Sequence, residues 1–271
     1  MAKLPPITDR PPAGDLLPRI IVGLLLIVLA LAAVWNGGWW FTALVALGVL
    51  LIFSEWAVMH GIPRLPRLGG LLVLALVCLA TQTGHLTEAL AGLAGAALML
   101  GLLARVAKLC QARWMTTGLL YAGLPGIALI WLRAQPQGLG FVLWVLTLVW
   151  ATDILAYFAG RSIGGPKIAP KLSPKKTWAG LIGGVIGAMV IGGGVADYVG
   201  FPAPLFATFS GALAVVAQAG DFFESWLKRR VGVKDSGTLL PGHGGIMDRV
   251  DGLVPVATLV FAALVLKDFW R

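Results

Sequence analysis

Residues 139–160 read LGFVLWVLTLVWATDILAYFAG, and Asp153 is the only charged side chain among them. A helix needs roughly 20 apolar residues to cross about 30 Å of hydrocarbon, so this run predicts a transmembrane helix. The rest of the chain has the same character, because its 271 residues are 58% hydrophobic and its mean hydropathy is +0.88. Such a composition leaves too little polar surface for a water-soluble globule. The sequence therefore predicts an integral membrane protein without a separate soluble domain.

Apolar runs of this kind recur along the whole chain. They are long and continuous, which favours helices over the short alternating strands of a barrel. We therefore predict an all-α, polytopic membrane protein with about nine transmembrane helices. The predicted helices cover residues 17–35, 39–59, 68–84, 86–104, 115–132, 139–160, 177–196, 203–226 and 250–267. The chain then divides into an N-terminal segment (1–16), about five N-terminal transmembrane helices (17–138) and a C-terminal catalytic region of about four helices with cytoplasmic loops (139–271).

The basic residues alternate between the predicted loops. All Lys and Arg except Arg133, Lys267 and Arg271 lie at or before the start of the first helix, or around the loops that follow the second, fourth, sixth and eighth helices. Cytoplasmic loops are enriched in Lys and Arg, so the N-terminus should be cytoplasmic and the C-terminus outside. This pattern is typical of a multi-pass protein of the inner, or cell, membrane.

The net charge of +9 is partly this topological signal and partly a surface that suits anionic lipid headgroups. No known nucleic-acid motif accompanies it, so we expect no nucleic-acid partner. Cys78 and Cys110 are the only cysteines, which provides no disulfide framework and no CxxC metal site.

A first polar group lies inside the predicted helix 139–160 and just after it. Asp153, Tyr157 and Arg161 recur every four residues and share one helix face. An acid within the membrane is costly, which favours a functional role for Asp153. The alternative is a structural polar cluster that joins Asp153 to Arg161.

A second polar group precedes the predicted helix 177–196. Ser173 followed by Pro174 is the pattern of a helix N-cap with proline at the first helical position. Lys175 and Lys176 would then point the same way as the free amides of that turn, which suits a phosphate chain. The alternative is a lysine cluster that only sets the topology.

The third polar group covers residues 221–251, DFFESWLKRRVGVKDSGTLLPGHGGIMDRVD. Asp221, Glu224 and Ser225 lie at helical spacing, and Asp248 and Asp251 lie at the entrance of the last predicted helix. Carboxylates from two neighbouring helix ends can hold a divalent cation for chemistry on a nucleotide phosphate, and the glycines of PGHGG let the backbone approach a ligand closely. The alternative is a self-neutralising surface loop. No paired Cys or His residues indicate zinc.

The same segment resembles the signature of the phosphatidate cytidylyltransferases, S-x-x-K-R-x(4)-K-D-x(5)-P-x-H-G-G-x-x-D-R-x-D. The matching positions are Ser225, Lys228, Arg229, Lys234, Asp235, Pro241, His243, Gly244, Gly245, Asp248, Arg249 and Asp251. The elements KLSPKKTWAG and D-x-x-A-Y-x-x-G-R also resemble features of this family, so the likeness covers about residues 150–252. The first half of the chain resembles the family only in being hydrophobic.

The resemblance implies that CTP and phosphatidic acid react to CDP-diacylglycerol and pyrophosphate, in phospholipid biosynthesis at the inner leaflet. It implies Mg²⁺ held by Asp221 and Asp248, a second, monovalent cation such as K⁺, and a homodimer among membrane lipids. It makes Asp221, Asp248, Lys228 and Arg249 catalytic, and Asp153, Asp235 and Asp251 supporting residues. The expected substrate-binding residues are Ser173, Lys175, Lys176, Ser225, Arg229, Lys234, His243, Gly244 and Gly245.

Two other functions compete with this interpretation. The CDP-alcohol phosphotransferases also use acids at the membrane edge, but their motif D-G-x(2)-A-R-x(8)-G-x(3)-D-x(3)-D is absent. A transporter could also use intramembrane acids and glycine-rich helices. Transporters often consist of two related halves, whereas here the polar residues are concentrated in the second half and no repeat is visible.

Overall fold

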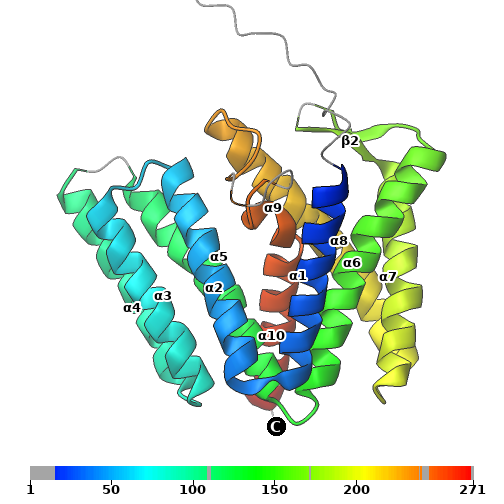
Figure 1. The fold of residues 1–271 in the computed structure, drawn as a ribbon, viewed down its shortest axis with the longest axis horizontal. Coiled ribbons are helices and arrows are strands. Elements are labelled where there is room, and N and C mark those ends of the chain that lie inside the picture. Colours follow the sequence, from blue (N-terminus) through cyan, green and yellow to red (C-terminus); the bar gives the residue numbers. More distant parts are fainter. Residues whose placement is uncertain (1–15, 109–110, 171, 238, 240–243, 270–271) are drawn as a thin grey trace, which may run out of the picture.

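The computed structural model describes residues 16–108, 111–170, 172–237, 239 and 244–269. They form a bundle of long helices with one small two-stranded sheet (Figure 1). The helices are α1 (Leu16–Asn36), α2 (Gly38–Met59), α3 (Arg64–Gln82), α4 (Leu86–Val106), α5 (Ala112–Ala134), α6 (Gly138–Ser162), α7 (Trp178–Tyr198), α8 (Ala203–Arg230), α9 (Met247–Val250) and α10 (Leu253–Phe269). The antiparallel strands are β1 (Lys167–Ala169) and β2 (Ser173–Thr177).

Each predicted apolar run coincides with one long helix. Within the described residues, 7 helices, α2 to α8, are long and apolar enough to cross a membrane. The apolar parts of α1 and α10, Gly23–Asn36 and Leu253–Lys267, are shorter. The all-α membrane class is therefore confirmed, while the count of nine goes beyond the seven spans found by length. The last predicted helix, 250–267, begins later than expected, because the short helix α9 precedes α10.

The basic loops come together at one end of the bundle. Figure 1 shows the connections α2–α3, α4–α5, α6–α7 and α8–α9 at the end where α1 begins, and the end of α10 at the opposite side. The basic loops, which alternate with other loops along the sequence, therefore lie on the same side of the folded molecule. We call this side of the molecule the basic end.

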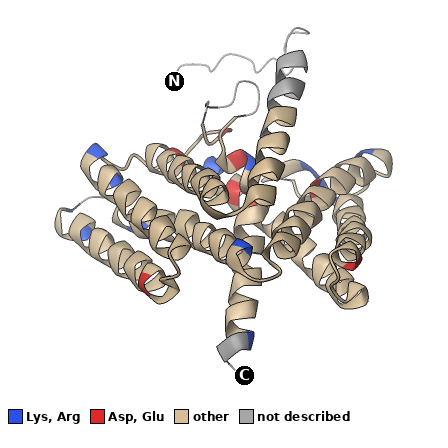
Figure 2. Ribbon diagram, turned by 60° about the horizontal axis from the view of Figure 1, so that its bottom comes forward, with Lys and Arg blue, Asp and Glu red and all other residues tan. Residues whose placement is uncertain are grey.

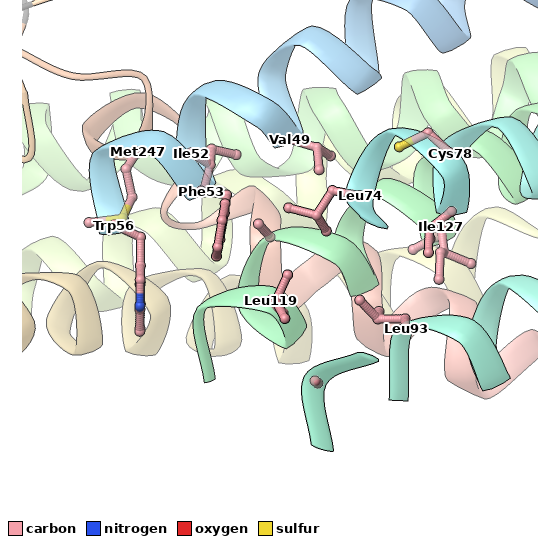
Figure 3. Packing of buried hydrophobic residues seen from close by; sticks show 14 of the residues in the cluster. Val49, Ile52, Phe53, Trp56, Leu74, Cys78, Leu93, Leu119, Ile127 and Met247 are labelled. Atoms are coloured by element: carbon pink, nitrogen blue, oxygen red, sulfur yellow. The ribbon is translucent and has the colours of Figure 1, made fainter. Parts of the chain in front are cut away.

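Two hydrophobic cores hold the helices together. The first lies among α2 to α5 and includes Phe53, Trp56 and Leu119 (Figure 3). It also takes in Leu227 of α8 and Met247 of α9, so the N-terminal helices pack directly under the polar segment of the C-terminal region. The second core joins residues of α1, α2, α5, α6, α7, α8 and α10.

Helices α6 and α7 pack closely because α7 presents small residues to α6. Gly180 and Gly184 are buried. A Cβ atom at Gly180 would lie 2.9 Å from the carbonyl oxygen of Ala156, and one at Gly184 would lie 2.9 Å from that of Thr152. Glycine removes this clash and lets the two backbones approach. The close contact fixes α7, and with it the preceding strand β2, against α6.

The predicted helix cap at Ser173 is wrong. Ser173 and Pro174 belong to strand β2, and α7 begins only at Trp178. Its N-cap is Thr177, whose hydroxyl accepts a hydrogen bond of 3.0 Å from the amide of Gly180. Residues Ser173–Thr177 pair with β1 in an extended conformation, so they do not form the first turn of a helix. Because side chains alternate along a strand, Lys175 and Lys176 do not share the orientation expected of a helical turn.

Candidate active site

Asp248, at the beginning of α9, is bound through both carboxylate oxygens. Its Oδ1 accepts a hydrogen bond of 2.6 Å from Lys228 Nζ. Its Oδ2 accepts hydrogen bonds from the Gly245 amide at 2.8 Å, the Ser236 amide at 3.0 Å and the Ser236 hydroxyl at 3.1 Å. The Asp248 side chain is 7% exposed and that of Lys228 is 13% exposed. Asp248 therefore links the end of α8 to both sides of the α8–α9 loop.

The glycines of this loop are required by the same contacts. Gly244 has φ 81, a left-handed conformation, and its Cβ would lie 2.6 Å from Asp248 Oδ2. A Cβ at Gly245 would lie 2.1 Å from the Ser236 hydroxyl oxygen. Within the protein, this close backbone approach is to Asp248 and Ser236. The expected close approach to a ligand stays a prediction.

Glu55 of α2 is a site residue that sequence reasoning missed. Its side chain is buried, and its Oε2 accepts hydrogen bonds from the Ser236 hydroxyl at 2.8 Å and the Met247 amide at 2.9 Å. Its Oε1 accepts one from the Ile246 amide at 2.8 Å. A carboxylate at free amides before and in the first turn of a helix is favourable, because those donors lack partners within the helix. An isolated acid in the apolar run 39–59 was the signal that could have revealed it.

The acids of α8 face the same region. Glu224 is buried, and its Oε2 lies 3.4 Å from Lys228 Nζ, one helical turn away. Lys228 thus lies between Glu224 and Asp248. The Ser225 hydroxyl donates a long hydrogen bond of 3.4 Å to Asp221 Oδ1. Figure 2 shows acidic and basic residues gathered between the central helices, although most of the ribbon carries neither charge.

The β hairpin reaches the site through one of its two lysines. Lys176 of β2 forms an ion pair with Asp221, and its ammonium lies 4.5 Å from the ring centre of Phe222. Lys175 is exposed. One lysine of the predicted pair is therefore bound to α8 and the other lies at the surface, while the binding of one phosphate ligand by both stays a prediction.

Two carboxyl groups of the α8–α10 connection have shifted pKa values. Burial alone would raise the pKa of Asp248, but the hydrogen bonds from Lys228 and from the Gly245 and Ser236 amides outweigh it and lower this pKa to about 2. For Asp251, burial and the nearby charge of Asp221 raise the pKa to about 6. Asp248 is therefore a permanent anion at neutral pH, while Asp251 takes up a proton far more readily.

Asp153 of α6 is exposed and lies near the same cluster of charges. It lies within electrostatic range of Asp251, Asp221, Lys176 and Arg249. Arg161, one of its predicted partners, donates a hydrogen bond of 2.9 Å to the Tyr157 hydroxyl at an exposed position. The structure thus associates Asp153 with the acids of the C-terminal region.

The remaining predicted residues lie around this centre. Four of them are exposed: Arg229, Lys234, Asp235 and Arg249. Within the described residues, the hydrogen bond found for Arg229 is a long one of 3.4 Å to the Val233 carbonyl oxygen. Gly220 packs against the backbone of Asp251, where a Cβ would lie 2.4 Å from the carbonyl oxygen, so α8 touches the α9–α10 turn. His243 and Pro241 lie outside the described residues.

The donor set fits a hard cation in chemical type. Glu224 Oε1 is buried without a hydrogen-bond partner among the described residues, and Asp251 and Asp248 lie close to it. A cation beside these oxygens would relieve their repulsion, and Mg²⁺ is commonly bound by one or two carboxylates with phosphate oxygens as further ligands. No three His, Cys, Asp or Glu side chains in the described part of the chain form a ready metal centre. Joint binding of one ion by Asp221 and Asp248 stays a prediction.

Comparison with known proteins gives consistent matches over nearly the whole chain. The family model described as "Cytidylyltransferase family" matches residues 17–267. A phosphatidate cytidylyltransferase of Brucella abortus is 40% identical over 259 residues, which cover 92% of this chain and 93% of the relative. Enzymes of the same name from Pseudomonas aeruginosa and Synechocystis are 37% and 34% identical, and cover 93% and 92% of this chain and 97% and 96% of their own lengths.

Proposed function

The chain belongs to the cytidylyltransferase family, and from this premise we propose that the charged cluster at the basic end is its active site. The reaction transfers the cytidylyl group of CTP to phosphatidic acid and gives CDP-diacylglycerol and pyrophosphate. The observation that supports this location is the network of Lys228, Asp248 and the loop amides, because it is built from residues of the family signature. The transporter and CDP-alcohol phosphotransferase alternatives account for neither the signature nor the family match.

The chemistry requires positioning and charge stabilisation more than a protein nucleophile. A phosphate oxygen of phosphatidic acid attacks the α-phosphorus of CTP in line, and the bond to pyrophosphate breaks. Lys176, Lys228 and Arg249 supply positive charge for the phosphates at this end of the bundle. Asp248 holds the Lys228 ammonium in place.

Mg²⁺ bound by Asp221 and Asp248 would neutralise phosphate oxygens and favour the departure of pyrophosphate. The lysines that pair with these acids in the structure, Lys176 and Lys228, are then placed to contact the same phosphates. A second cation such as K⁺ and a homodimer are further proposals that rest on the resemblance alone.

The active site is proposed to face the cytoplasm at the inner leaflet of the cell membrane. The support is the basic end, which carries the site and, among the residues that the structure describes, nearly all of the Lys and Arg. CTP would then meet the lipid headgroup at the membrane surface.

Two assays test the reaction and the side of the membrane on which it takes place. Purified protein in detergent, supplied with labelled CTP, phosphatidic acid and Mg²⁺, should form CDP-diacylglycerol and pyrophosphate in equal amounts, and EDTA should stop the reaction until Mg²⁺ is restored. In sealed vesicles, external CTP should be used by inverted vesicles and not by right-side-out vesicles. Activity only in right-side-out vesicles would refute the cytoplasmic site and leave the reaction intact.

The two lysines of β2 should differ in importance. Lys176→Ala removes the partner of Asp221 and a phosphate-binding charge, a loss of about 1.5 kcal/mol or more, or roughly tenfold in kcat/KM. Lys175→Ala, at the exposed position, should have a clearly smaller effect. Steady-state kinetics with each substrate varied would show the difference, and equal losses would contradict the structural distinction.

A further inference from the structure

An apolar groove runs from the proposed site into the bundle. Its volume is about 410 Å³, and it lies between α1, α2, α5, α6 and α10. Apart from Arg249, all of the residues that line it are uncharged and nearly all are hydrophobic. The lining along α2 includes Phe41, Val45, Gly48, Val49 and Ile52.

The groove has the depth of one membrane leaflet. From Phe41 to Ile52 the helix rises by about 16 Å. Half of the roughly 30 Å hydrocarbon core is about 15 Å. The upper end of the groove contains Ile246, Arg249 and Val250, which belong to α9 and the residue before it. The groove therefore starts beside Arg249 at the basic end and extends along α2 toward the opposite end of the bundle.

The lining of the groove is cationic at its upper end and apolar below that end. Arg249 supplies positive charge at the upper end, and the residues beneath it offer only apolar contacts. A phospholipid has the complementary order, with an anionic phosphate at the surface and an acyl chain in the hydrocarbon. CTP and pyrophosphate are polar throughout and do not match the lower part.

We propose that this groove binds one acyl chain of phosphatidic acid and so fixes the lipid phosphate beside Arg249. The proposal rests on the proposed function and adds the binding site of the lipid tail. It gives the N-terminal helices a direct role, since α1, α2 and α5 form much of the wall. An acyl chain bound in the groove fixes how deep the lipid phosphate lies. An error of about 1 Å in the position of a reacting group can lower a rate about a hundredfold.

Gly48 offers a way to close the groove without disturbing the protein around it. It lines the groove, and a Cβ atom built at Gly48 meets no heavy atom within 4 Å. A leucine there would occupy the space of the acyl chain. By contrast, a Cβ at Gly126 would lie 2.6 Å from Val49 Cγ2, so a substitution at Gly126 would strain the core.

Chain length separates a blocked groove from a damaged active site. Gly48 lies seven residues before Glu55 in α2, or about 10 Å of helical rise below the α9 loop. Measured from an ester group level with the α9 loop, a hexanoyl chain at about 1.5 Å per bond extends at most about 8 Å, so the tails of dihexanoyl-phosphatidic acid end above Gly48. Dioleoyl-phosphatidic acid must pass it.

The experiment compares both lipids in mixed micelles. Gly48→Leu should lower kcat/KM for dioleoyl-phosphatidic acid by about tenfold to a hundredfold, and should leave that for the dihexanoyl lipid and the KM for CTP within about twofold of the unsubstituted protein. Gly92→Leu is the matched control, because Gly92 of α4 also has open space at its Cβ and does not line the groove. Gly48→Val replaces Gly48→Leu if the larger variant does not accumulate.

Equal losses for both lipids, or no loss for either, would refute the acyl-chain site. Failure of the unsubstituted protein to convert either lipid would refute the proposed function instead. The two failures are therefore distinguishable from the same set of measurements.

Discussion

Asp248→Asn should abolish nearly all formation of CDP-diacylglycerol, with kcat lowered by about 10²–10³. Asp248 accepts hydrogen bonds from Lys228, Ser236 and Gly245, and an asparagine amide nitrogen cannot accept any of them. Lys228 would lose its closest anion in a largely buried position, and breaking such a pair costs about 3–5 kcal/mol. The substitution also removes a proposed Mg²⁺ ligand.

The measurement is the initial rate per amount of monodisperse protein, taken over a range of Mg²⁺ concentrations. Asp197→Asn is the control, because Asp197 is an exposed acid near the end of α7, on the side of the bundle away from the basic end. If more than about a tenth of the activity remained in Asp248→Asn, Asp248 would have no essential role. A loss that excess Mg²⁺ partly reverses would favour metal binding over loop positioning alone.

Glu55→Gln should lower kcat by about tenfold to a hundredfold, although Glu55 is proposed to touch neither substrate. The carboxylate accepts hydrogen bonds from the Ile246 and Met247 amides and from Ser236. A glutamine places an NH₂ group against at least one of these donors, and an unsatisfied buried donor costs about 1–3 kcal/mol. Since Asp248 follows Met247 directly, we expect the carboxylate of Asp248 to move relative to Lys228.

A positioning role predicts more than a loss of activity. For Glu55→Gln, kcat should fall while the KM for CTP changes little, and trypsin should cut the α8–α9 loop faster at its exposed lysine, Lys234. Glu88→Gln, at an exposed acid in the first turn of α4, is the matched control. A faster cut with unchanged kcat would show that Glu55 holds the loop without serving the reaction.

The candidate site was only partly predictable from sequence. The signature identified Lys228, Asp248, Gly244 and Gly245 together, and the structure brings these residues into one network. The helix cap at Ser173 was misplaced, because Ser-Pro followed by lysines is compatible with a helix start and with a strand, and the choice depends on pairing with β1. A local sequence pattern cannot distinguish a helical from an extended backbone when another segment supplies the hydrogen bonds.

The amino-acid sequence alone determined the membrane class, the positions of the apolar helices and the side on which the basic loops gather. These properties follow from the length and hydropathy of single segments, because each segment has to match the bilayer by itself. Tertiary structure decided which residues meet: Glu55 with the Met247 amide across 192 positions of chain, Lys176 rather than Lys175 with Asp221, and Arg249 with the apolar groove. Such contacts depend on how neighbouring helices pack side by side, and hydropathy does not distinguish one apolar face from another.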